Sequence, residues 1–286
     1  MTISNDPLSD TGLFVIGHGT KSSSGMDQYW QTVELIAKKR PRIATVGGLI
    51  EFASPNLDEG LDNLCQLGVR EVISVPLVLL GAGHQKDDGP EALRKARLRH
   101  PQITFRYGRA LGIHPNVLSA VESRIKSASP KSGTNNIGVV LVGRGSTDPD
   151  ANADLYKVAR LISDSRQLGD TVEPAFISLA RPSVEQALTK IKKLGLTSVI
   201  VAPYFLFTGV LLDRIYSEAM AWSKRENIPV SLAKEIGPES EIVELVWERF
   251  EEARSDSAHM NCDMCIYRSQ IPGYEHRVAA PPFSPS

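Results

Sequence analysis

Short apolar runs rich in β-branched residues alternate with amphipathic segments along the first half of the chain. The amphipathic segments, for example MDQYWQTVELIAKK and PNVLSAVESRI, carry apolar residues at the spacing of one helical face. The pattern predicts strands at 12–17, 43–51, 70–79 and 103–107. It predicts helices at 26–40, 57–67, 89–99 and 115–126. Regular alternation of strands and helices indicates a parallel sheet covered by helices on both faces.

The second half repeats this order, with strands expected near 137–142, 171–178, 197–206 and 229–234. The stretch GLIEFASPNLDEGLDNLCQLGVREVISVPLVLL, beginning at Gly48, parallels AFISLARPSVEQALTKIKKLGLTSVIVAPYFLF, beginning at Ala175, at an offset of 127 without a gap. FVIGHGT likewise matches VLVGRGS, and LGIHPNVLSAVESRI matches IGPESEIVELVWERF, at offsets of 126 and 125. This period is too long for a solenoid repeat, so a whole domain is duplicated. We therefore predict an α/β protein of two tandem homologous domains, each a four-stranded parallel sheet flanked by helices.

The duplication sets the expected domain boundaries. We place the N-terminal domain at 1–128 and the C-terminal domain at 136–255, joined by the linker SASPKSGTNN. Residues 256–286 lack apolar periodicity and end in a Pro- and Ser-rich stretch, which predicts an extension that is flexible at its end. A length of 286 residues, 42% of them hydrophobic, is enough for two separate cores.

Composition argues against some binding partners and indicates the cellular compartment of the protein. Acidic and basic residues are interspersed and the formal net charge is -1, so the chain lacks the basic field that phosphate backbones require, and no nucleic-acid partner is expected. The opening MTISNDPLSDTGLFVIGHG has no basic segment followed by a long apolar run, and no later run approaches the roughly 20 apolar residues of a membrane helix. Only three cysteines occur, which argues against a disulfide framework. We expect a cytoplasmic protein with no membrane partner.

Three polar residues of the first half follow predicted strands. His18 follows the first strand in GHGT, Glu51 ends the second in LIE, and His84 follows the third in LVLLGAGHQKDD. Ligands of open α/β sheets bind beyond the carboxyl ends of the strands, and a flavodoxin-like strand order would place the two histidines across one crevice with the glutamate nearby. Two imidazoles and one carboxylate suit a divalent transition metal, although a single His or Glu at a strand end is usually a cap, a loop residue or a satisfied core group.

The second half serves as an internal comparison for these residues. By the offsets of the repeat, the three positions correspond to Arg144, Ser178 and Leu211. All three candidates are replaced together, while the apolar runs and the prolines Pro55 and Pro182 persist. A shared chemical role in the first half explains this pattern better than three separate structural roles.

These motifs, in their order and spacing, resemble the class II chelatases, in particular the long two-domain sirohydrochlorin cobaltochelatases and their ferrochelatase relatives. In that family a first strand ends in GHG, an FLE-like strand precedes a Pro (here LIEFASP), and an apolar strand leads into G-x-H (here PLVLLGAGH). The resemblance covers essentially the whole chain and implies two chelatase-like domains, the N-terminal one catalytic and the C-terminal one degenerate. Departures occur at Leu49 and Ile50 and in the spacing at Asp87 and Asp88, none of which is an expected ligand.

The resemblance implies insertion of a divalent metal, Co²⁺ or alternatively Fe²⁺ or Ni²⁺, into the tetrapyrrole sirohydrochlorin. Insertion requires a metal held by few exchangeable ligands and a base that removes the two pyrrole protons. His18 and His84 are expected to be both ligands, or one the ligand and the other the base, because imidazole titrates near working pH. Glu51 is expected to bind the metal or to orient a histidine.

The substrate implied by the resemblance carries several carboxylates, so Arg or Lys side chains should line its site. Arg144, Arg181 and Arg214 lie at the matching strand ends of the second half, and Arg144 is favoured because it occupies the position of the first histidine. For Arg181 and Arg214 a solvated surface position is an equally good interpretation. Ser22 and Ser23 belong to an expected loop after the first strand that either closes over the substrate or is only a loop.

The tail contains MNCDMC, which places Cys262 and Cys265 in a C-x-x-C spacing. Such a pair can bind a metal or an iron–sulfur cluster or form a redox pair, and some long cobaltochelatases have a similar motif associated with a cluster. Two cysteines cannot complete a four-thiolate site, so a cluster would need His259, another ligand, or a second chain in a homodimer joined through the tail. A pair of exposed reduced thiols is the alternative.

Three functions stay open at this level. The C-x-x-C motif favours a cobaltochelatase of cobalamin synthesis, but a ferrochelatase that makes sirohaem would use the same ligands, because imidazole and carboxylate accept cobalt, iron and nickel alike. The third is a tetrapyrrole carrier or metal sensor with His18 and His84 as axial ligands. Turnover of sirohydrochlorin with Co²⁺ or Fe²⁺ separates these functions.

Overall fold

The computed structural model describes residues 9–130, 136–165 and 171–257, without the side chains of residues 84 and 85. The first half contains β1 (Thr11–Gly17), α1 (Ser23–Lys39), β2 (Thr45–Leu49), α2 (Leu57–Gln66), β3 (Glu71–Pro76), α3 (Gly83–Lys86), α4 (Asp88–Arg99), β4 (Thr104–Tyr107) and α5 (Pro115–Ala128). The second half contains β5 (Ile137–Gly143), α6 (Pro149–Asp164), β6 (Thr171–Phe176), α7 (Val184–Lys193), β7 (Ser198–Pro203), α8 (Val210–Glu226), β8 (Val230–Leu232) and α9 (Ser240–Arg254).

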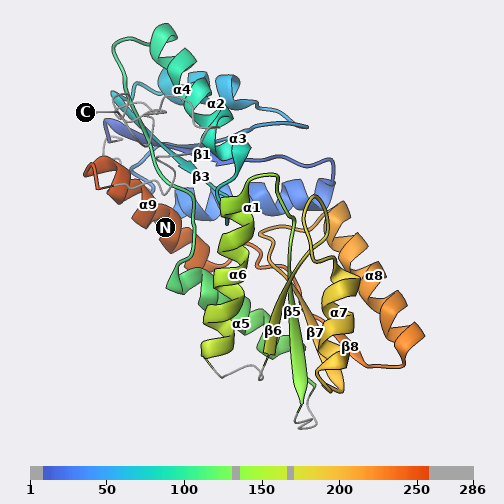
Figure 1. Cartoon of the computed structure of the whole chain (residues 1–286). Helices are drawn as coiled ribbons and strands as arrows, with labels where there is room; N and C mark the ends of the chain where they lie inside the picture. The colour runs from blue at the N-terminus through green and yellow to red at the C-terminus, as the bar shows by residue number, and fades with distance from the viewer. Residues whose placement is uncertain (1–8, 131–135, 166–170, 258–286) are drawn as a thin grey trace, which may run out of the picture. The chain divides into compact units, whose positions relative to one another are not determined.

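Each half forms a four-stranded parallel sheet (Figure 1). The strand order is β2-β1-β3-β4 in the first sheet and β6-β5-β7-β8 in the second. β1 pairs with β2 from Leu13 opposite Thr45 to Gly17 opposite Leu49, so the two strands end together at one edge. The predicted α/β fold with four parallel strands per half is confirmed, and β1 and β3 are neighbours, as they would be in a flavodoxin-like strand order.

Six strands are shorter than the apolar runs that predicted them, and β2, β3 and β7 are each four residues shorter. Because β2 ends at Leu49, Glu51 lies beyond the second strand and not at its end. The run at 70–79 leaves the sheet after Pro76, and the run at 197–206 leaves it after Pro203. The residues after these prolines, Leu77 and Tyr204, each still donate one backbone hydrogen bond of 2.8 Å to the neighbouring strand, and the pairing ends beyond them although the apolar pattern continues. The helix α3 was not predicted, because four residues are too few to display helical periodicity.

Helices cover both faces of each sheet. In the first sheet, α2 and α4 pack on one face around a buried cluster that includes Phe14, Leu61 and Leu93. Successive side chains of a strand alternate between faces, so the buried Leu13 and Val15 point to the other face. That face is covered by α1 and α9 (Figure 1).

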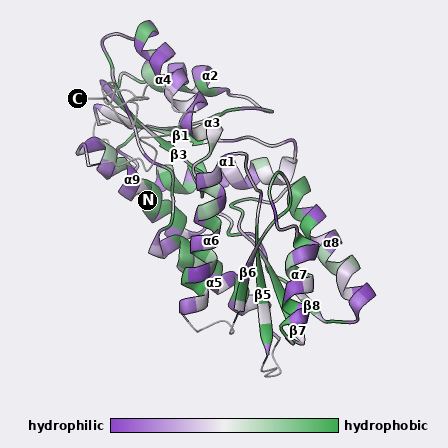
Figure 2. Ribbon diagram, viewed as in Figure 1, coloured by the Kyte–Doolittle hydropathy of each residue, from purple (hydrophilic) through white to green (hydrophobic). Residues whose placement is uncertain are grey.

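Hydropathy follows this layering. In Figure 2 hydrophobic residues concentrate on strands such as β5 and β7, whereas hydrophilic residues lie on the outer sides of helices such as α4 and α8. Among the helices within the described ranges, none combines the length and apolar composition needed to cross a membrane.

The chain folds into two compact units that exchange the last helix of each repeat. One unit comprises Met1–Gly112 with Ile242–Ser286, and the other comprises Ile113–Glu241. Helix α5, which ends the first repeat, packs against β7 and α6, while α9, which ends the second repeat, belongs to the unit of the first sheet. The expected boundaries 1–128 and 136–255 follow the sequence repeat, and the compact units cut across them at these two helices.

The sequence could not reveal this exchange because the two helices are homologous. Val117, Val121 and Ile125 form the buried face of α5, and Trp247 and Phe250 belong to that of α9. Either apolar face would cover a sheet of either half, so the periodicity is the same whichever sheet a helix joins. Only specific contacts decide the partner, such as the 3.2 Å hydrogen bond from the indole of Trp247 to the carbonyl oxygen of Ile36 in α1.

Candidate active site

His18 lies directly beyond β1, at the edge where the parallel strands end. Its carbonyl oxygen accepts a 3.0 Å hydrogen bond from the backbone N–H of Glu51, which extends the pairing of β1 and β2 by one step. Gly19 has φ +90°, and a Cβ there would come within 1.8 Å of the carbonyl oxygen of Glu51. Glycine is therefore required next to the histidine, because it lets the loops after β1 and β2 touch.

The side chains of His18 and Glu51 also meet. Nδ1 of the imidazole lies 3.3 Å from Oε1 of the carboxylate, and the two side chains keep 29% and 35% of their surface exposed. The contact is an ion-pair distance without hydrogen-bond geometry, and an imidazole whose Nδ1 faces a carboxylate directs the lone pair of Nε2 away from it, where a metal ion can bind. The pair can thus act as an oriented ligand, or as a base whose protonated form the carboxylate stabilises.

An exposed aromatic ring follows this pair in the sequence. The ring of Phe52 lies nearly parallel to the imidazole of His18, at an angle of 8° and a centroid distance of 6.5 Å. Nζ of Lys21 lies 5.4 Å from the centre of the Phe52 ring. Phe52 is 56% exposed and has φ 70°, a left-handed conformation that is unusual for a bulky residue.

His84 lies in α3, after β3, which neighbours β1 in the sheet. Its side chain is outside the described part of the chain. Among the described side chains there is no group of three His, Cys, Asp or Glu residues able to hold a metal. His18 and Glu51 are brought together as expected, and the completion of the triad by His84 stays a prediction.

In the second half the loops beyond β5 and β6 have the same backbone conformation, but the candidate functional side chains are replaced. Ser178 N–H donates a 3.0 Å hydrogen bond to the carbonyl oxygen of Arg144, and a Cβ on Gly145 would come within 2.0 Å of the carbonyl oxygen of Ser178. Leu179 occupies the position equivalent to Phe52 and also has positive φ, 54°. The loop geometry is therefore a property of the fold, whereas the imidazole, carboxylate and aromatic ring occur at these positions only in the first half.

A family model describes both halves. The CbiX model matches residues 12–128 and again residues 138–253. This chain belongs to the CbiX family. The resemblance to class II chelatases inferred from the GHG, LIEFASP and GAGH motifs is thereby confirmed.

Curated relatives of this CbiX-family chain include enzymes of two metal specificities. The sirohydrochlorin cobaltochelatase of Priestia megaterium is 33% identical over 263 residues, covering 90% of this chain and 84% of that protein. The sirohydrochlorin ferrochelatase of the same organism is 31% identical over 209 residues, covering 73% of this chain and 77% of that protein.

Solved structures share the fold of this CbiX-family chain. SirB from Bacillus subtilis with Fe³⁺ matches with a TM-score of 0.76 and 26% identity, over 86% of this chain and 96% of that one. The sirohydrochlorin chelatase SirB from Bacillus subtilis subspecies spizizenii in complex with cobalt matches with a TM-score of 0.73, at the same identity and coverage.

Some of the other residues expected in the site of this CbiX-family protein have structural roles. Ser22 caps α1, since its hydroxyl accepts a 3.3 Å hydrogen bond from Gly25 N–H, and Ser23 is the exposed first residue of that helix. The loop expected at these serines is thus the first turn of α1. Arg214 forms a 2.8 Å ion pair with Glu218 one turn along α8, which corresponds to the solvated alternative.

The remaining expected residues divide by exposure and by position. Arg144 and Arg181 are exposed beyond β5 and β6. Cys262 and Cys265 lie outside the described residues, so the cluster expected there stays a prediction. Sequence reasoning missed Phe52 and Lys21. A comparison of LIEFASP with its repeat FISLARP would have revealed the aromatic residue, which the second half replaces by Leu179.

Proposed function

We propose that this protein is a sirohydrochlorin chelatase that inserts Co²⁺ into sirohydrochlorin for cobalamin synthesis. The contact of 3.3 Å between His18 Nδ1 and Glu51 Oε1, at the carboxyl ends of two adjacent parallel strands, carries the proposal. It provides one oriented imidazole and one carboxylate, both partly exposed, at the edge where α/β sheets bind ligands. Such donors bind first-row divalent metals and leave coordination positions open for exchange.

In the proposed reaction the metal is a substrate. Two pyrrole N–H groups lose their protons, the metal forms bonds to these two nitrogens and to the two unprotonated ring nitrogens, and the protein ligands are released from the metal. His18 binds the incoming metal through Nε2 while the Glu51 carboxylate faces the other ring nitrogen. His84, from α3, acts as the second ligand or as the base that takes up the pyrrole protons.

In this proposal the second half supplies residues that bind the substrate but no metal ligands. Arg144 is the favoured partner for a substrate carboxylate, because guanidinium binds carboxylates in a bidentate manner. Arg181 is a second exposed cation of the same sheet edge. Arg214 and Ser22 also have structural roles, in an ion pair and in a helix cap.

The choice of cobalt over iron is the finer part of the proposal. It is supported by the longer match to the cobaltochelatase, which covers 90% of this chain against 73% for the ferrochelatase of the same organism. The donor types do not separate the two metals. A sirohydrochlorin ferrochelatase is therefore the second candidate, and a tetrapyrrole carrier is the third.

Anaerobic assays with metal-free sirohydrochlorin and equal concentrations of Co²⁺ or Fe²⁺ test the proposal, with metal insertion followed by absorbance. We expect enzyme-dependent insertion of both metals and a higher kcat/KM for Co²⁺. A higher value for Fe²⁺ would assign the protein to sirohaem synthesis. Tight binding of the tetrapyrrole with no acceleration by the protein would identify a carrier.

Cys262 and Cys265 carry a separate part of the proposal, an iron–sulfur cluster that two chains share through their tails. Protein purified without oxygen should be brown, contain iron and sulfide, and sediment as a dimer. The Cys262→Ser, Cys265→Ser double variant should be colourless and monomeric but should still insert metal, because the proposed ligands lie in the first half of the sequence. Colourless wild-type protein would contradict the cluster.

A further inference from the structure

Phe52 and Lys21 form an exposed pair next to His18 that the chemistry of metal insertion does not use. We propose that this pair is the docking platform for the tetrapyrrole: the Phe52 ring stacks on the macrocycle and the Lys21 ammonium binds one of its carboxylates. The inference rests on the proposed function only in naming the ligand as a flat, apolar ring system with carboxylate side chains.

The exposure and position of the Phe52 ring support stacking. Its centroid lies 6.5 Å from that of the His18 imidazole, with the two planes within 8° of each other, so a macrocycle stacked on the phenyl ring lies next to His18. The Nε2 lone pair lies in the plane of the imidazole, so the imidazole must rotate out of this orientation to deliver a metal to the face of the macrocycle. With 56% of its surface exposed, Phe52 contributes little to the core, and its large apolar area is available to a ligand.

The backbone at Phe52 shows that the ring is not required for the fold. Phe52 and Leu179 occupy equivalent positions of the repeat, with φ 70° and 54° and exposures of 56% and 66%. The fold thus holds a side chain outward at this position in both halves and accepts an aliphatic one. The aromatic ring coincides with the half that has His18 and Glu51, as a role in ligand binding requires.

Lys21 adds the charge that such a ligand needs. Its ammonium lies 5.4 Å from the centre of the Phe52 ring, so a carboxylate at the rim of a stacked macrocycle comes within reach of it. The cation–π contact also holds the flexible lysine near the ring before the ligand arrives. Apolar stacking with one adjacent cation distinguishes this platform from a purely ionic anion site.

The first test compares Phe52→Leu, which installs the residue of the second half, with Phe52→Tyr, which keeps the ring. Kd for metal-free sirohydrochlorin is measured by absorbance titration, and kcat and KM with Co²⁺ are measured separately. We expect Phe52→Leu to raise Kd and KM about five-fold and to leave kcat within about two-fold, whereas Phe52→Tyr stays near wild type. Leu179→Ala, at the equivalent backbone position, should leave Kd unchanged.

Lys21→Met and Lys21→Arg test the charge. Lys21→Met should weaken binding about three-fold at low salt and lose part of the salt dependence of Kd, because added ions screen the attraction between an exposed ammonium and a ligand carboxylate. Lys21→Arg should keep both the affinity and the salt dependence.

The outcomes separate this inference from the proposed function. If wild-type protein inserts metal but Phe52→Leu binds sirohydrochlorin as tightly as wild type, the platform is wrong and the chelatase stands. If wild type binds without turnover and Phe52→Leu still loses affinity, the platform stands and the chelatase is wrong. A fall in kcat at unchanged Kd, or an equal loss in Leu179→Ala, would also overturn the platform.

Discussion

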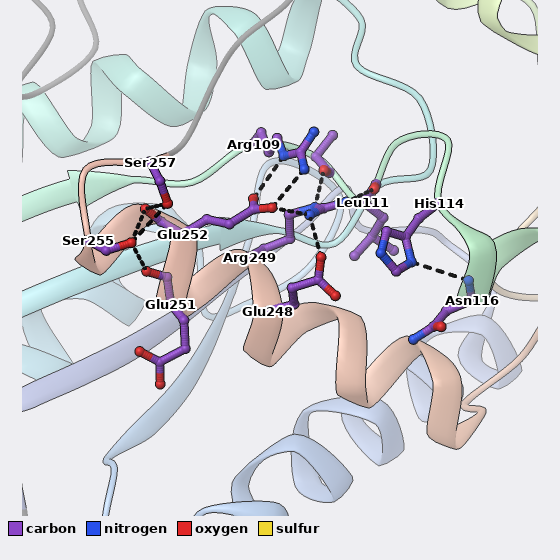
Figure 3. Close-up of polar contacts among 11 residues, drawn as sticks. Arg109, Leu111, His114, Asn116, Glu248, Arg249, Glu251, Glu252, Ser255 and Ser257 are labelled. Carbon is purple, nitrogen blue, oxygen red and sulfur yellow. Dashed lines mark hydrogen bonds and ion pairs between the residues drawn. The ribbon is translucent and has the colours of Figure 1, made fainter.

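Arg249 of α9 donates a 2.9 Å hydrogen bond to the carbonyl oxygen of Leu111, which precedes it by 138 residues (Figure 3). The same guanidinium donates to the carbonyl oxygen of Ala110 at 3.2 Å and to Glu252 Oε1 at 2.7 Å. Its side chain is 1% exposed, and burial, with the nearby Arg109 cation, lowers its pKa. This network joins α9 to the segment that leaves β4, and so helps to keep the last helix of the chain in the unit of the first sheet.

Replacing Arg249 by Met should therefore destabilise the protein strongly. The change leaves two carbonyl oxygens and the partly buried Glu252 carboxylate with fewer partners, and breaking a buried pair costs about 3–5 kcal/mol. Urea unfolding measures the loss. Arg254→Met is the matched control on the same helix, because its ion pair with Glu251 is exposed and should contribute no more than about 0.5 kcal/mol. Equal effects of the two variants would contradict the structural role of Arg249.

The same network predicts a dependence of stability on pH. Burial tends to raise the pKa of Glu252, but hydrogen bonds from Arg109 and the charge of Arg249 outweigh it and lower the pKa below the usual 4.5. A lowered carboxyl pKa stabilises the folded state above the unfolded pKa, and this contribution is lost as pH falls through the folded pKa.

The check is the free energy of unfolding of wild type minus that of Glu252→Gln. We expect the difference to be constant from about pH 7 to 5 and to shrink as the pH falls below about 4.5. Glu244→Gln serves as control, because Glu244 is half exposed in its pair with Lys39 and should show a much smaller difference at every pH. A difference for Glu252→Gln that grows on acidification would mean that the sign of the pKa shift is wrong.

The fold was predictable because its signals are local or repeated. The alternation of apolar runs and amphipathic segments predicts the parallel sheets, and the 127-residue offset between Gly48 and Ala175 predicts the duplication. The exchange of α5 and α9 was not predictable, because it depends on side chains such as Arg249 that meet backbone groups far away in the sequence. In the sequence, Arg249 appears only as a charged residue within a helical pattern. The sequence does not indicate which backbone groups it contacts.

The site assignment predicts the effect of removing the histidines. His18→Ala and His84→Ala should each lower kcat/KM for metal insertion by about 100-fold or more, since each removes a ligand or a base. Circular dichroism and thermal unfolding should stay close to wild type for His18→Ala, whose side chain is 29% exposed. Leu211→Ala, at the position of the second half that matches His84, should leave turnover intact. Wild-type activity in both histidine variants would exclude the site.

Substitutions at the equivalent glycines Gly19 and Gly145 should have similar effects on stability but different effects on activity. Gly19→Ala and Gly145→Ala each push a Cβ against a carbonyl oxygen, at 1.8 and 2.0 Å, and should each destabilise by about 3 kcal/mol or more. Only Gly19→Ala should also lose turnover in the protein that remains folded, because it displaces Glu51 from His18. Gly68→Ala is the control for conformation alone: φ is 83° but nothing lies within 4 Å, so about 1–2 kcal/mol is expected.

The sequence indicated the polar residues of the candidate site better than the roles of the residues around them. His18 and Glu51 are conspicuous because strand ends in a parallel sheet converge and because the repeat replaces both residues. Ser22 looked like a ligand-binding loop residue, but Ser at the start of an amphipathic segment is equally the signature of a helix cap. In the sequence Phe52 is not distinguishable from other apolar residues, because only the folded structure places its ring outward and parallel to the imidazole of His18.

The exchange of the terminal helices makes its own prediction, because each helix stabilises the sheet of the other repeat. Trp247 in α9 is 1% exposed and contacts α1 of the first unit, whereas Ile125 in α5 is fully buried and belongs to the unit of the second sheet. Truncating either side chain to Ala leaves a cavity, which destabilises by about 3–5 kcal/mol for Trp and 2–5 kcal/mol for Ile. Local opening should therefore increase in the sheet that the helix covers.

Hydrogen–deuterium exchange read by mass spectrometry locates that opening. In Trp247→Ala, peptides from β1 and β3 should exchange faster while peptides from β5 and β7 keep their protection. In Ile125→Ala the pattern should reverse, although Ile125 belongs to the first repeat by sequence. If each variant instead lost protection in the sheet of its own repeat, the helices would follow the sequence boundaries 1–128 and 136–255 and the exchange would be wrong.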